Sequence, residues 1–171
     1  MGEIKKVRII FLLCILIISA CEERVVTENT NDSFGIYLTR DEVLPTHLEA
    51  LSHIAPADKP LISLNEIVSY TWSDHTILLT EKGRQILDTL SLGVYGRSFL
   101  VCVNGSPKYH GAFWTLISSV TFVGTTIIIT RWTSGIIRIG RGYPIDFDTS
   151  LPDPRMNSDV ETVLRLAGKL R

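Results

Sequence analysis

The chain has 171 residues, a formal net charge of −1 and 45% hydrophobic residues, a length that predicts one domain. The near-neutral charge argues against a nucleic-acid partner, because nucleic-acid-binding proteins usually present a basic face. Three cysteines are too few for a disulfide scaffold.

The first twenty residues differ from the rest of the chain. Fourteen of them are hydrophobic, and Lys5, Lys6 and Arg8 precede an unbroken apolar run over residues 9–18. Basic residues, a short apolar core and then small residues are typical of a secretory signal. The run is shorter than the roughly 20 residues that a membrane-spanning helix needs. Residues 1–20 are therefore predicted to be a signal peptide, which leaves a mature chain of net charge −3.

The end of this leader, Ile18-Ser19-Ala20-Cys21, resembles the lipobox of bacterial lipoproteins. In that family a diacylglyceryl group is attached to the cysteine, which becomes the first residue after cleavage. The resemblance implies lipidation of Cys21 and anchoring to a membrane on its extracytoplasmic side. The resemblance does not decide whether the lipid anchors the protein to the inner or to the outer membrane. The alternatives are an ordinary signal peptide with a chance cysteine, or a buried N-terminal strand.

Residues 21–33 are predicted to be a lipidated, flexible tether. From Glu22 to Ser33 the sequence is polar and acidic, with few bulky side chains to bury. Twelve extended residues reach at most roughly 40 Å. Such a tether would hold a folded domain near a membrane without fixing it there, and residues 34–171 are expected to form that domain.

The first part of the domain mixes strand and helix signals. Residues 34–38 are rich in strand formers, whereas leucines at helical spacing predict a short helix over residues 46–54. Ser63 and Glu66 form a capping-box pattern. That pattern predicts a second helix over residues 64–69.

A strand is predicted over residues 76–79, followed by a helix. Thr80 is a good N-cap, and Ile86, Leu87 and Leu90 form an apolar stripe behind it. This segment is expected to pack one helical face against the core.

Two hairpins are predicted in the second half of the chain. Asn104-Gly105 separates apolar runs over 97–103 and 108–114, and both turn residues tolerate positive φ. Residues 125–132 and 135–139 predict a second pair of strands. Hairpins rather than alternating strands and helices favour an antiparallel sheet.

The chain is predicted to end on a helix. Residues 140–156 hold glycines, prolines and aspartates and suggest a surface loop, and Ser158 and Glu161 form another capping-box pattern. An apolar stripe comes after it. In total we expect an α+β fold, with an antiparallel sheet of about five strands built from hairpins and about three helices on one face.

No pattern for catalysis or for a metal stands out, so no catalytic residue, metal or cofactor is predicted. The four histidines lie too far apart in sequence for a helical zinc pair. Asp146 and Asp148 begin like a calcium loop, but Leu151 and Asn157 occupy the positions of its glycine and bidentate glutamate. Cys102 lies in an apolar run and is expected to be a buried thiol.

Aromatic residues are the best candidates for contacts with a ligand or partner. Trp72 and His75 share a predicted turn, and Tyr109, His110 and Trp114 crowd one strand. Alternation along that strand places Tyr109 on one face and His110 and Trp114 on the other. These residues form either part of the core or an exposed binding platform.

Several segments resemble those of bacterial envelope lipoproteins of no assigned activity. They are Phe34–Leu38, Leu61–Ser63, Tyr109–Thr115 and Asp153–Arg155.

A second resemblance links Leu79–Gly83 and Phe99–Gly105 to the extracytoplasmic head of the protein-export component SecD. In that head a strand and a helix precede a hairpin. This resemblance implies an α+β fold and a peptide-binding role, and no export role is carried over because the membrane helices of SecD have no counterpart here.

The sequence leaves three hypotheses for function. The first is a membrane-anchored, non-enzymatic lipoprotein that binds a protein, peptide or small ligand in the bacterial cell envelope. The second is a small envelope hydrolase that uses His75 or His110. The third is a structural or assembly subunit of an envelope complex.

Overall fold

The computed structural model describes residues 33–130, 135–144 and 152–171. The predicted signal peptide, Cys21 and all of the predicted tether except Ser33 lie outside these residues. Among the described residues, no helix is both long and apolar enough to cross a membrane.

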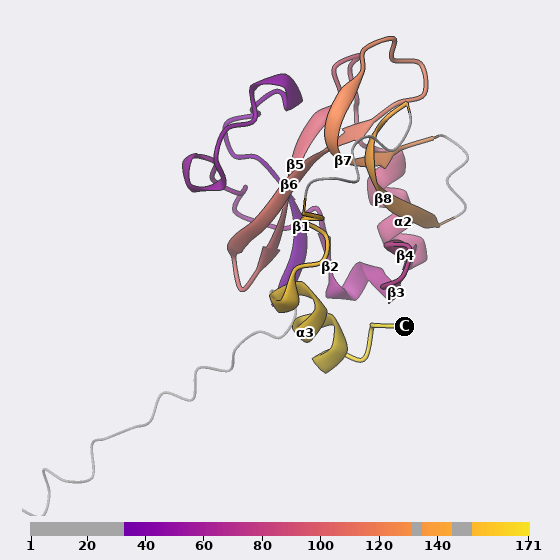
Figure 1. Cartoon of the computed structure of the whole chain (residues 1–171). Helices are drawn as coiled ribbons and strands as arrows, with labels where there is room; N and C mark the ends of the chain where they lie inside the picture. The colour runs from indigo at the N-terminus through magenta and orange to yellow at the C-terminus, as the bar shows by residue number, and fades with distance from the viewer. Residues whose placement is uncertain (1–32, 131–134, 145–151) are drawn as a thin grey trace, which may run out of the picture.

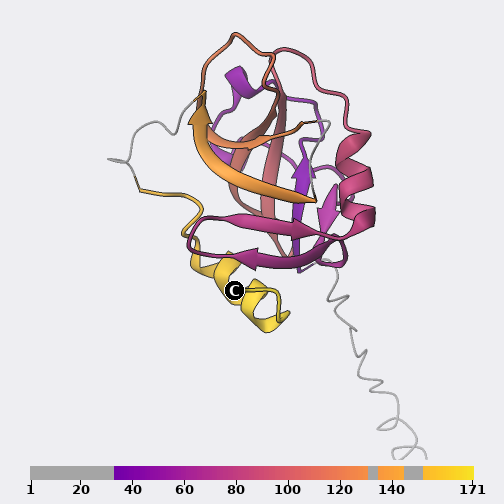
Figure 2. The same cartoon turned by 90° about the vertical axis from the view of Figure 1, so that its right-hand side faces the viewer.

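The fold is α+β, with one strongly curled, half-barrel sheet (Figures 1 and 2). In the described residues the sheet has eight strands in the order β2-β1-β5-β6-β7-β8-β4-β3. Their bounds are β1 Phe34–Leu38, β2 Ile62–Ser63, β3 Ile67–Thr71, β4 Thr76–Leu79, β5 Arg97–Val103, β6 Ser106–Trp114, β7 Phe122–Ile128 and β8 Ile136–Tyr143.

The prediction of a purely antiparallel sheet of about five strands is wrong. The sheet is mixed, because β6 and β7 pair in parallel, with Gly111 opposite Thr125 and Trp114 opposite Ile128. The segment that joins the two strands, residues 115–121, is short, and hairpin rules do not predict it because they apply only to antiparallel neighbours. β2, with two residues, and β3 are the strands that the sequence pattern did not reveal.

The hairpin predictions are confirmed. β5 and β6 pair antiparallel around Asn104 and Gly105, which both have positive φ as their turn requires. β7 and β8 also pair antiparallel. β8 continues to Tyr143, into the predicted surface loop, of which residues 145–151 lie outside the described part of the chain.

Two α-helices are present in the described residues instead of about three: α2, Glu81–Asp88, and α3, Ser158–Leu166. The predicted helix over 46–54 is two separate 3-10 turns, η3 (Pro45–His47) and η4 (Leu51–His53). Pro45 begins the first turn and extended residues end both, so neither continues.

The first capping box is confirmed, but it caps a single turn. Ser63 donates from its backbone N–H to the Glu66 carboxylate at 3.0 Å, and its hydroxyl accepts from the N–H of Asn65. η5 (Leu64–Glu66) then ends at Ile67, which is extended and begins β3. The β-branched residues after Glu66 favour a strand, and their pairing with β4 overrides the helix that the cap predicts.

α2 and α3 begin as side-chain caps dictate. Thr80 caps α2 as predicted, by accepting from the N–H of Gly83. The N-cap of α3 is Asn157 rather than Ser158, since the Asn157 side chain accepts from two backbone N–H groups. Both helices bury their apolar stripes in the same core, Leu87 from α2 and Leu164 from α3.

The two faces of the sheet pack different cores. On β5, Phe99 and Val101 point into the main core inside the half-barrel, where the Phe113 ring lies 5.1 Å from that of Phe99. Leu100 and Cys102 point the other way and pack with residues of the segment between β1 and β2. Burial of the Cys102 thiol, as predicted, raises its pKa to about 12.

The outer edge of β3 is covered by the C-terminal residues. The backbone N–H of Tyr70 donates to Lys169 O, and the N–H of Arg171 donates back to Tyr70 O, each at 2.8 Å. The N–H of Trp72 donates to Arg171 O at 2.9 Å. Lys169 also donates from Nζ to Ile67 O at 2.6 Å. An open edge would be a template for unwanted pairing, and these bonds close it.

Candidate functional site

The predicted aromatic residues do not form one exposed platform. Tyr109 points into the main core and Trp114 into a separate outer cluster, so the predicted alternation is confirmed. Trp114 is fully buried, with its ring stacked 5.2 Å from that of Phe122. His110 is half-buried on the same strand. Because Tyr109 and Trp114 have almost no exposed surface, any role in binding would need the core to open.

Trp72 and His75 come together at the turn between β3 and β4. Their rings lie edge to face with centroids 5.5 Å apart. His75 is only 4% exposed, and its Nδ1 forms a 2.9 Å hydrogen bond with the Tyr70 hydroxyl. This imidazole is therefore a packed, hydrogen-bonded part of the core rather than a free base.

An ion pair between buried Arg155 and half-buried Asp153, which sequence reasoning missed, lies near this turn. Arg155, 8% exposed, donates from Nε and Nη2 to Asp153 at 2.6–3.2 Å and from Nη1 to Ile139 O at 2.6 Å. The guanidinium holds the pKa of Asp153 down to about 2. In the sequence the two residues stand out only because the segment Asp153–Arg155 resembles envelope lipoproteins. Their position in a predicted loop gives no sign that Arg155 is buried.

Burial and the charged groups around His75 set its charge. Burial lowers the pKa of His75, and the positive charge of Arg155 lowers it further, while Asp153 and Asp74 act in the opposite direction. His75 is thus neutral in the folded protein near neutral pH.

This arrangement predicts a loss of stability in mild acid. A histidine whose folded pKa is depressed contributes stability above its unfolded pKa, about 6.5, and loses it as the pH falls below that value. One proton changes the free energy of unfolding by at most about 1.4 kcal/mol per pH unit. We expect His75→Asn, which keeps an acceptor for Tyr70, to flatten the decline between pH 7 and pH 5 in urea titrations.

The control is His47→Asn, because His47 is exposed. It should keep the wild-type slope of stability against pH. Equal slopes for wild type and His75→Asn would show that His75 does not govern this range.

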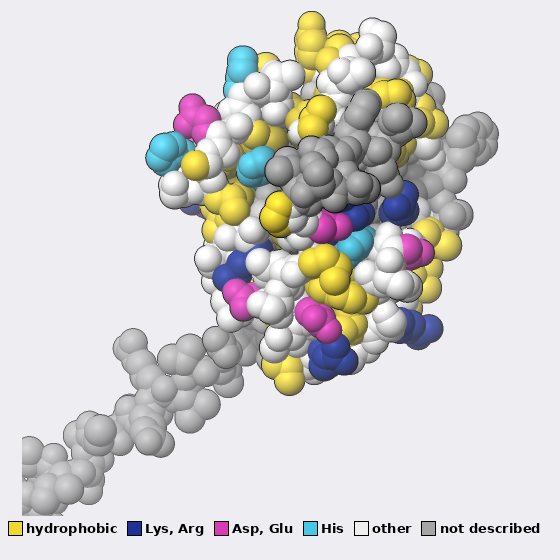
Figure 3. Space-filling model, in the orientation of Figure 1, with side chains coloured by type: hydrophobic (Ala, Val, Ile, Leu, Met, Phe, Trp, Pro, Cys, Tyr) yellow, Lys and Arg dark blue, Asp and Glu magenta, His cyan; other side chains and the backbone are white. Residues whose placement is uncertain are grey.

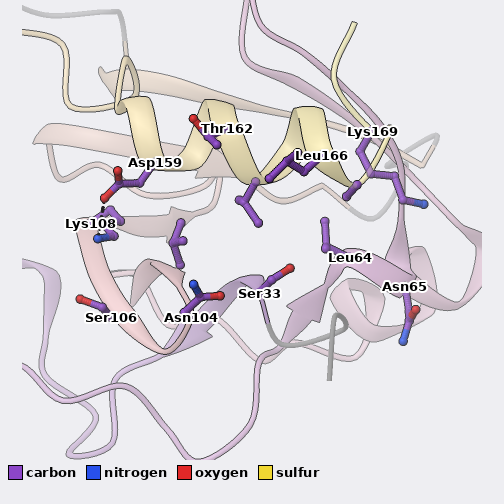
Figure 4. A pocket seen from close by; sticks show the side chains of 13 residues that line it. Ser33, Leu64, Asn65, Asn104, Ser106, Lys108, Asp159, Thr162, Leu166 and Lys169 are labelled. Carbon is purple, nitrogen blue, oxygen red and sulfur yellow. Dashed lines mark ion pairs between the residues drawn. The ribbon is translucent and has the colours of Figure 1, made fainter. Parts of the chain in front are cut away.

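A groove of about 870 Å³ lies beside α3 in the described part of the chain (Figure 4). We call it the α3 groove. One wall is α3 and the residues just after it; the other is the β5–β6 turn, Ser33 and η5. Its lining residues are Ser33, Leu64, Asn65, Val103, Asn104, Ser106, Lys108, Asp159, Thr162, Val163, Leu166, Ala167 and Lys169.

The α3 groove combines an apolar surface with polar groups along its rim. Leu64, Val163 and Leu166 supply the apolar part, and Leu166 is 83% exposed. Lys108 Nζ and Asp159 Oδ2 form an ion pair 2.7 Å long across one end (Figure 4). The groove is therefore open to solvent and partly apolar, and an ion pair joins its two walls at one end.

A second groove of about 850 Å³ adjoins the first and shares Ser33, Asn65 and Asn104 with it. Near it, the Glu66 carboxylate accepts from Lys82 Nζ at 2.7 Å. Burial alone would raise the pKa of Glu66, but hydrogen bonds from Lys82 and Ser63 outweigh it and lower the pKa. Glu66 is thus a structural anion that fixes η5 and the wall of both grooves.

Neither groove contains His75 or His110, the residues of the hydrolase hypothesis. The lining residues include no histidine or cysteine, and the described part of the chain contains no group of three His, Cys, Asp or Glu side chains able to hold a metal. The amide side chains of Asn65 and Asn104 offer donors and acceptors beside apolar surface. That combination suits an extended peptide or another amphipathic ligand.

Sequence reasoning did not find the α3 groove. The helix and the hairpin that form its walls were predicted, but their approach depends on the curl of the sheet. Leu166, at the end of α3, was the one available signal, because it lies off the buried stripe of Val160 and Leu164.

No family model matches the chain, and comparisons with curated proteins and with solved structures give no match either. The similarity to envelope lipoproteins and to the SecD head therefore remains a prediction.

Proposed function

We propose that this protein is a lipid-anchored, extracytoplasmic lipoprotein that binds an extended peptide segment of an envelope partner in the α3 groove. Cys21 carries the lipid, and the folded domain carries the binding site. The observation that carries the proposal is the α3 groove itself, with its exposed apolar surface and its rim of amide and charged groups.

The position of Ser33 supports this combination of anchor and groove. Ser33 lines both grooves, and its carbonyl accepts from the N–H of Asn104 at 3.0 Å. The tether therefore enters the fold beside the binding surface. A partner bound there is held close to the membrane that carries the anchor.

No observation favours the hydrolase hypothesis. His75 is bonded to Tyr70, and the nearby Asp74 carboxylate accepts from the N–H of Thr76. His110 lines neither groove. A purely structural role is a weaker alternative, because it gives no account of the α3 groove.

Lipidation is tested by growth with radiolabelled palmitate. The wild-type protein should incorporate the label, and Cys21→Ala should lose it. Equal labelling of the two proteins would contradict the anchor, whatever the groove does.

The groove is tested by site-specific photo-crosslinking in the native envelope. A photoreactive residue at Leu166 should form an adduct that maps to one contiguous segment of a partner. The control position is Met156, which is 57% exposed and does not line the α3 groove. The Leu166 adduct should be roughly tenfold more abundant, as expected for a specific contact worth about 1.4 kcal/mol. Equal adducts from both positions would contradict peptide binding in the α3 groove.

A further inference from the structure

Two neighbouring loops expose apolar side chains at the end of the sheet away from the α3 groove. Val94 and Tyr95 lie in the loop before β5, and Leu116 and Ile117 in the loop after β6; they are 51%, 53%, 62% and 84% exposed. We call these four residues the apolar tip. In Figure 3 hydrophobic side chains are visible at the upper end of the molecule, where Figure 1 places these loops.

The apolar tip is held in place by hydrogen bonds between and beneath the loops. The Ser118 hydroxyl donates to Val94 O at 2.6 Å, which ties one loop to the other. The Tyr143 hydroxyl contacts Leu116 O and Ser118 O, each at 3.1 Å. The four side chains are thus presented outward by a fixed support.

The apolar tip lies in a part of the chain without charge. Residues 89–96 and 114–130 contain no Asp, Glu, Lys, Arg or His. Aliphatic side chains with a tyrosine and no charge are typical of surfaces that enter the boundary between lipid headgroups and acyl chains. A stable protein interface usually needs about 20–30 residues a side, and the apolar tip has four.

The length of the tether allows the apolar tip to reach the membrane that holds the anchor. Ser33 bonds to Asn104 at one end of β5, and the tip adjoins Arg97 at the other end. Seven strand residues span about 20 Å. The twelve residues from Glu22 to Ser33 reach at most roughly 40 Å. A domain tethered in this way has a high effective concentration at the bilayer. The tether is also long enough for the domain to rotate until the apolar tip faces the membrane.

We propose that the apolar tip inserts into the lipid bilayer and orients the domain with the α3 groove facing away from the membrane. This inference rests on the proposed anchor at Cys21. With two points of attachment, the lipid and the apolar tip, the domain lies against the membrane and leaves the α3 groove open to partners.

The test uses the full chain, purified and reconstituted in vesicles of phosphatidylethanolamine and phosphatidylglycerol. Ile117→Cys and Leu166→Cys provide matched labelling positions, because the two native side chains are 84% and 83% exposed. Each is labelled with an environment-sensitive fluorophore, and the unsubstituted chain, in which Cys102 is buried, gives the background. Nitroxide-labelled lipids then quench any fluorophore that enters the bilayer.

The label at Ile117 should be quenched and that at Leu166 should stay in water. Adding Leu116→Asp should reduce the membrane-inserted fraction roughly tenfold, as expected for the loss of one buried aliphatic side chain. Quenching of neither label, or of Leu166 alone, overturns the inference. Shielding of Ile117 that depends on protein concentration without lipid also overturns it, in favour of a second copy.

Flotation of the same vesicles separates this inference from the proposed function. If the chain floats with the vesicles but Ile117 is not quenched, only the insertion of the apolar tip is wrong. A chain that does not float overturns both the anchor and the insertion.

Discussion

Arg155→Ala is expected to destabilise the fold by about 3–5 kcal/mol, the usual effect of removing one partner of a buried ion pair. The substitution leaves the Asp153 carboxylate without its guanidinium and Ile139 O without its donor. Because Ile139 lies in β8, the pair joins the C-terminal segment to the middle of the sheet. Urea unfolding monitored by circular dichroism measures the change.

The control for this pair is Arg165→Ala. Arg165 pairs with Glu161 on the exposed side of α3, where its side chain is 65% exposed. Such surface pairs contribute about 0.3–0.5 kcal/mol. Losses of similar size in the two variants would show that burial of Arg155 adds nothing to the stability of the fold.

Gly111→Ala is expected to cost about 3 kcal/mol or to prevent folding, because the parallel pairing of β6 and β7 leaves no room for a side chain. A Cβ at this position would lie 2.5 Å from both Thr125 O and the Phe99 ring, and would also meet Thr125 Oγ1. The backbone oxygen belongs to the paired strand and cannot move without breaking the register.

Gly93→Ala is the matched control, since a Cβ at Gly93 meets no atom within 4 Å and its φ is not positive. Alanine there should be neutral or stabilising by up to about 1 kcal/mol, because it restricts the unfolded chain. Thermal and urea unfolding of both variants give the comparison. Similar stabilities for the two would contradict the close contact between β6 and β7.

The sequence predicts well those elements whose signals are local. The Asn104-Gly105 turn and the Thr80 cap need only neighbouring residues, and both are found. The cap at Ser63 is also correct, but the length of the helical turn after it depends on β4, which pairs with Ile67 from the other side of a turn. Local signals give the start of an element more reliably than its extent.

The parallel pair and the α3 groove arise from contacts between distant residues. Nothing near Trp114 indicates that the chain will return parallel to β6. Leu166 lies off the buried stripe of its helix, but its position does not indicate that α3 will face Asn104. Of the two alternatives that the aromatic residues left open, Tyr109 and Trp114 take the core, because burial of their rings stabilises the fold more than exposure would. The alternation along β6 was correct, and it places them in two cores.

The three C-terminal residues that close the edge of β3 also affect when the fold can be completed. Lys169 Nζ and Ile67 O are 102 residues apart in sequence, and Tyr70 and Trp72 bond to the same end of the chain. Contacts of such separation form late and slow folding. The edge of β3 therefore stays unpaired until residues 169–171 have been synthesised and released. For a chain exported as proposed, this edge is closed only after residues 169–171 have crossed the membrane.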